Sequence, residues 1–297
     1  MPQVAFVTGA AGAMGARLLP ALRGAGWRTR ALEHRRAVEH ADERAPGDLA
    51  DAESLRAGAT GAAAVLHLAA CTHARRDGDY RAVNVDGTAR MLEAARAAGV
   101  DRFVHVSTRA ISAHGGGYSR SKLEAEELVR SGPLEHVIVR LPEVYGAGGQ
   151  EGIDDMLRRA RGGSAIPVVG RGTDVLCPAH VDDVTGPLVA ALSAPVAAGR
   201  TYTLAGDCHT AREVAEACAR AYGGRNRIVC VPSRLVALAC AGARFLPLPV
   251  YPDQLARLRA EKPAPSPEAR DDLGFAPRPL QAGLRDAASA AAAGASP

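Results

Sequence analysis

A glycine-rich loop joins the first predicted strand to the first predicted helix. Residues 4–7 form a short apolar, strand-like run, and residues 15–23 have the spacing of an amphipathic helix. The segment between them reads Thr8-Gly9-Ala10-Ala11-Gly12-Ala13-Met14-Gly15. Glycines at such a junction let phosphates approach the backbone N–H groups at a helix N-terminus, where the helix dipole favours negative charge. We therefore expect a dinucleotide site here rather than a plain tight turn.

Strands and helices alternate through the first half of the chain. Apolar runs predict further strands at 29–32, 64–68, 102–106 and 137–141, and helical spacing appears at 81–98 and 119–129. Strands separated by helices imply right-handed βαβ units, and hence a parallel sheet with helices on both faces. The predicted fold class is therefore α/β, a Rossmann-type doubly wound parallel sheet.

The pattern becomes less regular after about residue 146. We expect a dinucleotide-binding domain over 1–146, to which the chain returns at about 180–205, and a smaller, mostly helical substrate domain over 147–297. The Ala-rich end, 287–297, predicts a frayed helix or a disordered tail. Within the second half, helices are predicted at 181–192, 211–221, 235–243 and 252–259, and a strand at 201–204.

The charge and the cysteine content limit the kinds of partner that the protein is expected to bind. Across 297 residues, 36 Lys and Arg against 32 Asp and Glu give a net charge of +4, and the basic residues are scattered, so no nucleic-acid partner is expected. The six cysteines show no CxxC pair, which predicts no metal site, no disulfide, and reduced thiols in a cytoplasmic protein. The longest apolar segment, 235–243, is too short to cross a bilayer, so no membrane partner is expected either.

The end of the second predicted strand carries mixed signals about the dinucleotide. Glu33 lies 24 positions beyond Gly9, where a carboxylate would accept hydrogen bonds from a ribose 2′-hydroxyl and favour NAD. His34, Arg35 and Arg36 follow directly, and cations there would bind the 2′-phosphate of NADP. A solvated arginine-rich loop is the alternative interpretation. We expect NADPH, with NADH as the second candidate.

Tyr118-Ser119-Arg120-Ser121-Lys122 has YxxxK spacing at the start of a predicted helix. Residues four apart share one helix face, so the phenol and the ammonium would point at the same bound cofactor. A nearby cation would lower the tyrosine pKa and help it to donate a proton to a carbonyl. The alternative is an exposed tyrosine beside a solvated lysine. The chain has only two lysines, Lys122 and Lys262, which favours the catalytic interpretation.

Further motifs resemble the extended short-chain dehydrogenase/reductase superfamily, that is, its NAD-dependent epimerase/dehydratase branch. The GxxGxxG spacing after Thr8 is typical of that superfamily. Additional matching segments are Gly47-Asp48-Leu49-Ala50-Asp51, Leu66-His67-Leu68-Ala69-Ala70, Asn84-Val85-Asp86-Gly87-Thr88, Arg140-Leu141-Pro142-Glu143-Val144-Tyr145-Gly146, His180-Val181-Asp182-Asp183-Val184 and Leu273-Gly274-Phe275-Ala276-Pro277.

The resemblance implies a set of site residues. It places Thr108 at the catalytic Ser/Thr, with Ser107 as the alternative, beside Tyr118 and Lys122. Asn84 would support the lysine through water or cap a helix. A homodimer would be usual for the family. The implied cofactor contacts are Gly9, Ala11, Gly12, Ala13, Met14, Gly15, Glu33, His34, Arg35, Arg36, Asp48, Leu49, Leu68, Ala69, Ala70, Asn84, Lys122 and Pro142.

The loop between Thr108 and Tyr118 is shorter than extended members usually have. Only ten positions separate the two residues, and Gly115-Gly116-Gly117 lies between them. We expect a more open site and a flexible glycine run. A mechanism in which water or the substrate supplies the proton is the alternative to Tyr118.

The second half suggests the substrate. Leu176 stands four residues before His180, where nucleotide-sugar members of the family place an arginine, and 231–238 and 245–251 are apolar. This layout resembles the 3β-hydroxysteroid dehydrogenase and dihydroflavonol reductase side of the branch. It predicts an NAD(P)H-dependent ketoreductase for a hydrophobic, aromatic or polycyclic ketone in bacterial secondary metabolism. The alternatives are a nucleotide-sugar epimerase, dehydratase or 4-ketoreductase, and a dinucleotide-binding regulator without activity.

Overall fold

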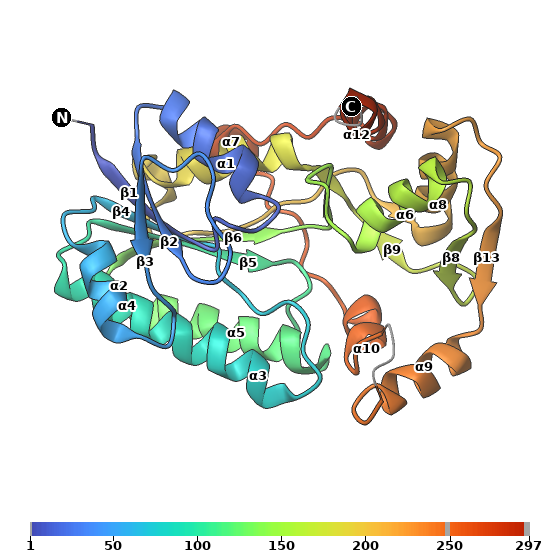
Figure 1. The fold of residues 1–297 in the computed structure, drawn as a ribbon, viewed down its shortest axis with the longest axis horizontal. Coiled ribbons are helices and arrows are strands. Elements are labelled where there is room, and N and C mark those ends of the chain that lie inside the picture. The colour runs from blue at the N-terminus through green and yellow to red at the C-terminus, as the bar shows by residue number, and fades with distance from the viewer. Residues whose placement is uncertain (1, 247–249, 294–297) are drawn as a thin grey trace.

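A seven-stranded, all-parallel sheet forms the centre of the molecule (Figure 1). The computed structural model describes residues 2–246 and 250–293. The strand order is β11-β6-β5-β4-β1-β2-β3, so it reverses between β1 and β4. The Rossmann-type prediction is confirmed. The strands are β1 (Val4–Thr8), β2 (Arg28–Glu33), β3 (Glu43–Pro46), β4 (Ala64–His67), β5 (Arg102–Thr108), β6 (Glu135–Leu141) and β11 (Thr201–Thr203).

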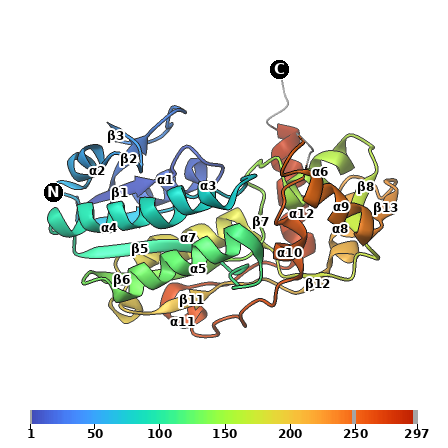
Figure 2. The ribbon, with the colours of Figure 1, turned by 90° about the horizontal axis from the view of Figure 1, so that it is seen from below.

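Helices cover both faces of this sheet (Figure 2). Alternate strand residues point to opposite faces: Val7 and Val104 pack in one apolar cluster, whereas Phe6 and Phe103 pack in another, all fully buried. Because both faces are buried, the strands read as nearly continuous apolar runs. The first cluster is covered by α1 (Gly15–Gly24), α7 (Val181–Ala191) and α11 (Ala269–Leu273), and the second by α2 (Ala52–Ala59), α4 (Gly87–Ala97) and α5 (Gly116–Ser131).

The helix predicted at 81–98 contains a change of helical type. It begins as α3 (Asp77–Arg81), continues as a π-helical turn (Ala82–Asp86) and ends as α4. Asn84, in the π turn, is 1% exposed. Such turns are frequent at functional sites because they redirect one side chain within a helix.

The remaining elements form a second group around their own apolar cluster. Three two-stranded sheets pair β7 with β10, β8 with β13, and β9 with β12. Leu284 and Ala287 of α12 are buried in this cluster and the helix continues to Ala293, so over 287–293 the disordered alternative is wrong and the helical one describes the chain. Residues 294–297 lie outside the described residues. The elements are β7 (Val144–Tyr145), α6 (Gly152–Arg161), β8 (Ile166–Val169), β9 (Val175–Leu176), β10 (Ala179–His180), β12 (His209–Thr210), α8 (Ala211–Ala221), β13 (Ile228–Val231), α9 (Ser233–Gly242), α10 (Gln254–Arg259) and α12 (Leu280–Ala293). A 3-10 turn (Pro195–Ala197) packs instead in the first cluster through the buried Ala197.

A disulfide joins Cys177 to Cys208. In the antiparallel pair β9–β12, Leu176 lies opposite His209, which places the two cysteines on neighbouring positions with their Cα atoms 4.0 Å apart. The prediction of reduced thiols throughout is therefore wrong for this pair. The 31-residue separation carried no signal because two very short strands bring the partners together. Cys71, Cys218, Cys230 and Cys240 are free.

A buried carboxylate fixes α5 on the sheet. Glu126 is fully buried and accepts hydrogen bonds from Ser107 Oγ at 2.6 Å and from Arg140 Nε and Nη2 at 2.9 and 2.6 Å. Arg130 contributes a further ion pair. Burial alone would raise the pKa of Glu126, but the bonds from Arg140 and Ser107 lower it below its ordinary value. The carboxylate therefore ties α5 to β5 and β6.

We expect Glu126→Met to lower the free energy of unfolding by about 3–5 kcal/mol, because it leaves two guanidiniums without their buried partner. The measurement is equilibrium denaturation in urea. Glu124→Met, on the same helix, is the control: its carboxylate is half exposed and paired with Arg81, so it should cost less than about 1 kcal/mol. Equal losses in the two variants would contradict the role of Glu126.

Candidate active site

The glycine loop packs against the end of β4. Gly9 has a φ of +75°, and a Cβ there would lie 2.6 Å from the Ala69 nitrogen, so this position requires glycine. The contact lies between β1 and β4, where the strand order reverses and a crevice for ligands is expected. Within the described residues, the backbone N–H groups of Ala11, Ala13 and Met14 donate no hydrogen bond to protein. They precede α1 directly and fit the phosphates of a dinucleotide.

A buried chain of hydrogen bonds sets the position of this loop. The Thr88 hydroxyl donates to Asn84 O at 2.7 Å and therefore accepts from His67 Nε2 at 3.1 Å. His67 Nδ1 then accepts from Thr8 Oγ1 at 2.7 Å, and Thr8 Oγ1 accepts from the Ala69 N–H at 3.2 Å. Burial and the nearby charge of Lys122 lower the pKa of His67 to about 3, so its ring stays neutral. A neutral ring is needed because Nδ1 accepts a hydrogen bond while Nε2 donates one.

The residues expected to choose between NAD and NADP meet at the ends of β2 and β3. Glu33 Oε2 accepts a hydrogen bond from the Val38 N–H at 2.8 Å, so one carboxylate oxygen holds its own loop. His34 Nε2 lies 3.0 Å from Asp48 Oδ2. This contact joins the predicted cofactor residues that follow β2 to those that follow β3. Arg35 and Arg36 are exposed, and neither forms an ion pair within the described residues.

Asn84 joins the π turn to α5. Its Oδ1 accepts from the Cys71 N–H at 2.7 Å, and its Nδ2 donates to Cys71 O and to Ser121 Oγ at 3.0 and 2.9 Å. It lies inside a continuous helical segment rather than at a helix start, so it is not a helix cap. Its amide fixes Cys71, just beyond Leu68, Ala69 and Ala70, next to the helix that carries Lys122.

Tyr118 lies beside Thr108 at the carboxyl end of β5. Burial raises the pKa of Tyr118, whereas the positive charge of Arg257 and the nearby Thr108 hydroxyl act in the opposite direction. The Arg257 guanidinium lies over the tyrosine ring, with Cζ 4.9 Å from the ring centre. The predicted acid and the predicted Ser/Thr are therefore neighbours, and the cation against the phenol comes from α10.

Lys122 points into the protein rather than toward Tyr118. Its Nζ donates to Val106 O at 2.8 Å and lies 3.3 Å from His105 Nε2, and the side chain is 2% exposed. Burial lowers the pKa of Lys122 to about 8, partly offset by the negative charge of Glu126. The YxxxK spacing thus places both residues on α5, but the ammonium is bound to the backbone of β5.

The glycine run before Tyr118 is closely packed, in contrast to the flexible loop that we expected. Gly116 has a φ of +86°, and a Cβ there would lie 2.3 Å from the Cβ of Asp253. A Cβ at Gly117 would lie 2.6 Å from Asp77 Oδ1. Asp253 is 7% exposed, and it accepts hydrogen bonds from the Tyr118 N–H and the Tyr80 hydroxyl, both at 3.0 Å. The short loop therefore holds Tyr118 in place.

Asp253 and Arg257 were not predicted as site residues from the sequence. Both come from the segment around α10, which packs against α5 across more than 130 residues of chain. Arg257 is held by Thr72 O at 3.0 Å and by His73 Nε2 at 3.2 Å. No motif predicts such contacts, because only the tertiary fold brings α10 to the start of α5.

The other predicted cofactor residues lie along the same carboxyl edge of the sheet. They follow β1, β3, β4 or β6 directly, as ligand-contacting residues of doubly wound sheets do. Their roles stay predictions. These residues are Gly12, Gly15, Leu49, Leu68, Ala70 and Pro142. Among the described residues, no group of three or more His, Cys, Asp or Glu side chains is placed to hold a metal ion, and none of the helices is long and apolar enough to cross a bilayer.

Comparison with known proteins identifies the family. The model of the NAD dependent epimerase/dehydratase family matches residues 5–205. Ceramide reductase of Caulobacter vibrioides is 33% identical over 77% of this chain and 74% of its own. A 4-hydroxy-2-methyl-3-oxo-4-farnesyl-3,4-dihydroquinoline-1-oxide ketoreductase of Stigmatella aurantiaca is 36% identical over 48% of this chain and 50% of its own. MoeE5, solved with UDP-glucuronic acid and NAD, is 25% identical, with a TM-score of 0.81 over 98% of this chain and 99% of its own.

The chain belongs to the NAD-dependent epimerase/dehydratase family, the extended branch of the short-chain dehydrogenase/reductases. It is an NAD(P)-dependent oxidoreductase that acts on a small molecule. The family membership and the oxidoreductase activity that the motifs predicted are both confirmed.

The buried Lys122 should make stability depend on pH. The lysine of the unfolded chain keeps the ordinary pKa of 10.5, so above pH 8 the unfolded state binds more protons than the folded state. The free energy of unfolding should therefore rise with pH in this range. Relative to Lys122→Met, the wild type should gain about 2–3 kcal/mol between pH 7.5 and 10. Urea denaturation of both proteins across this range is the measurement; a constant difference would show that the lysine titrates normally.

Proposed function

We propose that the protein is an NADPH-dependent ketoreductase of a hydrophobic ketone. The observation that carries this proposal is the pairing of Tyr118 with Thr108 at the end of β5, on the sheet edge that also carries the glycine loop. A hydroxyl pair at this place can bind a carbonyl oxygen and give it a proton. The reductases named above support a reduction, and their sources support a role in bacterial secondary metabolism.

Tyr118 is the proposed acid. Its pKa is raised by burial, so the hydroxyl stays protonated at neutral pH and is ready to donate. Once the proton has left, the Arg257 charge and the Thr108 hydroxyl stabilise the phenolate. Thr108 also orients the substrate oxygen. A bound nicotinamide supplies the hydride. Lys122 holds the end of β5 through Val106 O, and binding of the ribose by Lys122 remains part of the proposal.

A cavity between α9 and α10 supports a hydrophobic substrate. Its volume is about 710 Å³. The relatives named above act on a ceramide and on a farnesyl-bearing quinoline oxide, which are both hydrophobic molecules. Of the apolar segments singled out in the sequence, 231–238 contributes Ala237 to the lining and 245–251 contributes Phe245, whereas 247–249 lie outside the described residues. The cavity is lined by Ala237, Cys240, Ala241, Arg244, Phe245, Pro252, Leu255, Ala256 and Arg259.

A nucleotide-sugar enzyme is the second candidate, because MoeE5 was solved with a UDP-sugar. Leu176 argues against it: the residue is 7% exposed, apolar, and stands where nucleotide-sugar members place an arginine. The regulator alternative is disfavoured by the Tyr118–Thr108 pair. The domain boundary at 146, the homodimer and a cytoplasmic location remain predictions.

Assay of a panel of hydrophobic ketones with NADPH tests the function, and Tyr118→Phe tests the mechanism. The variant keeps the ring beneath Arg257 but loses the acid, so kcat should fall by about 10²–10⁴-fold with little change in KM. Tyr222→Phe, at the end of α8, is the control and should retain full activity. A Tyr118→Phe enzyme with a third of wild-type turnover would mean that water or the substrate supplies the proton. Turnover of UDP-sugars but of no ketone would favour the second candidate.

Cofactor preference should depend on the two unpaired arginines after β2. Replacing Arg35 and Arg36 together by Ala should raise the KM for NADPH at least about tenfold and leave that for NADH nearly unchanged, because only NADPH loses charge-assisted bonds to its 2′-phosphate. Initial rates with both cofactors are the measurement. Arg220→Ala combined with Arg225→Ala, two exposed arginines at the end of α8, is the control. Equal weakening of both cofactors would exclude recognition of the phosphate by these residues.

A further inference from the structure

Arg109 is a buried cation without full hydrogen bonding. It follows Thr108 at the end of β5 and is only 7% exposed. Its Nε and Nη1 atoms are buried and have no hydrogen-bond partner among the described residues. The Glu143 carboxylate lies 4.0 Å from Nη1, which is too far for a hydrogen bond, and the same oxygen accepts from the Cys177 N–H at 3.2 Å. A buried guanidinium in this state is stabilised by any ligand that brings oxygen acceptors.

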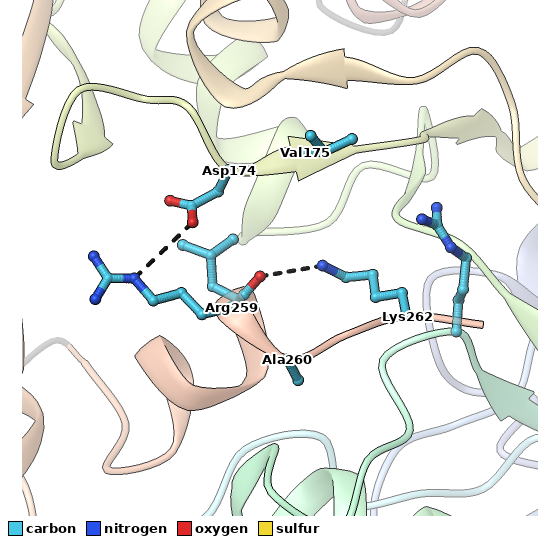
Figure 3. Close-up of a pocket in the computed structure, with 7 residues that line it drawn as sticks. Asp174, Val175, Arg259, Ala260 and Lys262 are labelled. Atoms are coloured by element: carbon cyan, nitrogen blue, oxygen red, sulfur yellow. Dashed lines mark hydrogen bonds and ion pairs between the residues drawn. The ribbon is translucent and has the colours of Figure 1, made fainter. Parts of the chain in front are cut away.

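Arg109 lines a small polar cavity of about 360 Å³ with the end of α10 and the start of β9 (Figure 3). Two further cations line it, Arg259 and Lys262, against one carboxylate, Asp174. Asp174 is paired with Arg259, at 4.0 Å. Lys262 Nζ donates to Leu258 O at 3.1 Å, and within the described residues no carboxylate lies within ion-pair distance of it. With Glu143, which pairs with Arg109 from outside the lining, the three cations face two carboxylates, so one positive charge remains in excess at the cavity.

Residues next in sequence to the proposed reaction centre line the cavity, although Thr108 and Tyr118 do not line it themselves. Arg109 follows Thr108 directly, and Leu258 follows Arg257, whose guanidinium lies over Tyr118. The helix α10 separates this polar cavity from the apolar one beside α9, and Arg259 lines both. The two cavities therefore share Arg259 as a common wall, with cations on one side of α10 and apolar side chains on the other.

We propose that the substrate carries an anionic oxygen group, a carboxylate or a phosphate, which Arg109 and Lys262 bind, while its apolar part occupies the cavity between α9 and α10. The inference rests on the proposed ketone reduction and narrows its substrate to amphiphilic ketones. Arg109 is the specificity-determining residue, because its guanidinium gains the hydrogen bonds that the protein does not provide.

Matched pairs of ketones test this proposal and separate the two anions. Oxododecanoic acids with the ketone at positions 3 to 6 are compared with their methyl esters, and a long-chain dihydroxyacetone phosphate ester is compared with its dephosphorylated form. In the wild type, the anionic member of at least one pair should have a KM at least tenfold lower. Arg109→Gln should remove this difference and change the KM of the neutral member less than threefold, and Arg109→Lys should restore part of it. Arg220→Gln should have no effect.

Equal KM values within every pair in the wild type would overturn the proposal, as would an equal loss for both members in Arg109→Gln. Calorimetric binding of the same pairs in the presence of NADPH needs no turnover. Preferential binding of an anion that Arg109→Gln abolishes, without reduction of any ketone, would keep the inference and reject the ketoreductase. Binding of UDP-glucose that depends on Arg109, with none of the amphiphiles bound, would reject both.

Discussion

The close approach of two backbones between β1 and β4 is the constraint on which the site depends. Gly9 fits against Ala69 only because it has no Cβ, and the Thr8 hydroxyl joins the same two loops by a hydrogen bond. His67 and Thr88 extend this connection to the helix that follows β4. These hydrogen bonds are buried, and each group in them can act in only one way as donor or acceptor. The position of the glycine loop is therefore fixed by the core of the sheet rather than by a bound ligand.

The reaction centre is completed by a segment from the other end of the chain. The sheet and α5 supply Thr108 and Tyr118, but the cation over the phenol and the carboxylate at the start of α5 come from the region of α10. The same helix separates a polar cavity from an apolar one. In the proposed function, chemistry and substrate choice therefore belong to different parts of the fold that meet at α10, as is common when one scaffold supports many substrates.

The sequence predicted the parts of the fold that depend on local pattern. Four of the seven sheet strands, β1, β4, β5 and β6, contain buried apolar runs, whereas β3 (Glu43–Pro46) alternates half-buried and exposed residues at the sheet edge and shows no such run. The Ala-rich end looked like a tail because alanine carries little apolar signal, although Ala287 and Ala288 are buried.

Only the site residues that belong to recognisable sequence motifs could be predicted. The glycine loop, Thr108 and Tyr118 meet at one sheet edge because the parallel topology requires it. The direction of the Lys122 ammonium, the packing of Gly116 and the cysteine pair depend on tertiary contacts that no spacing encodes. Asp253 and Arg257 belong to the same class, since they meet α5 only after the two ends of the chain have come together.

Asp253 also has a kinetic consequence. Any movement of α10 away from α5 breaks its bonds to the Tyr118 N–H and the Tyr80 hydroxyl and removes Arg257 from the ring. Two hydrogen bonds and one cation–π contact together cost about 3 kcal/mol. The bonds of Arg257 to Thr72 O and to His73 Nε2 add to this cost, so the detached state would be populated well below about one per cent. A ligand that has to displace α10 must wait for this minor state, which slows both its arrival and its release.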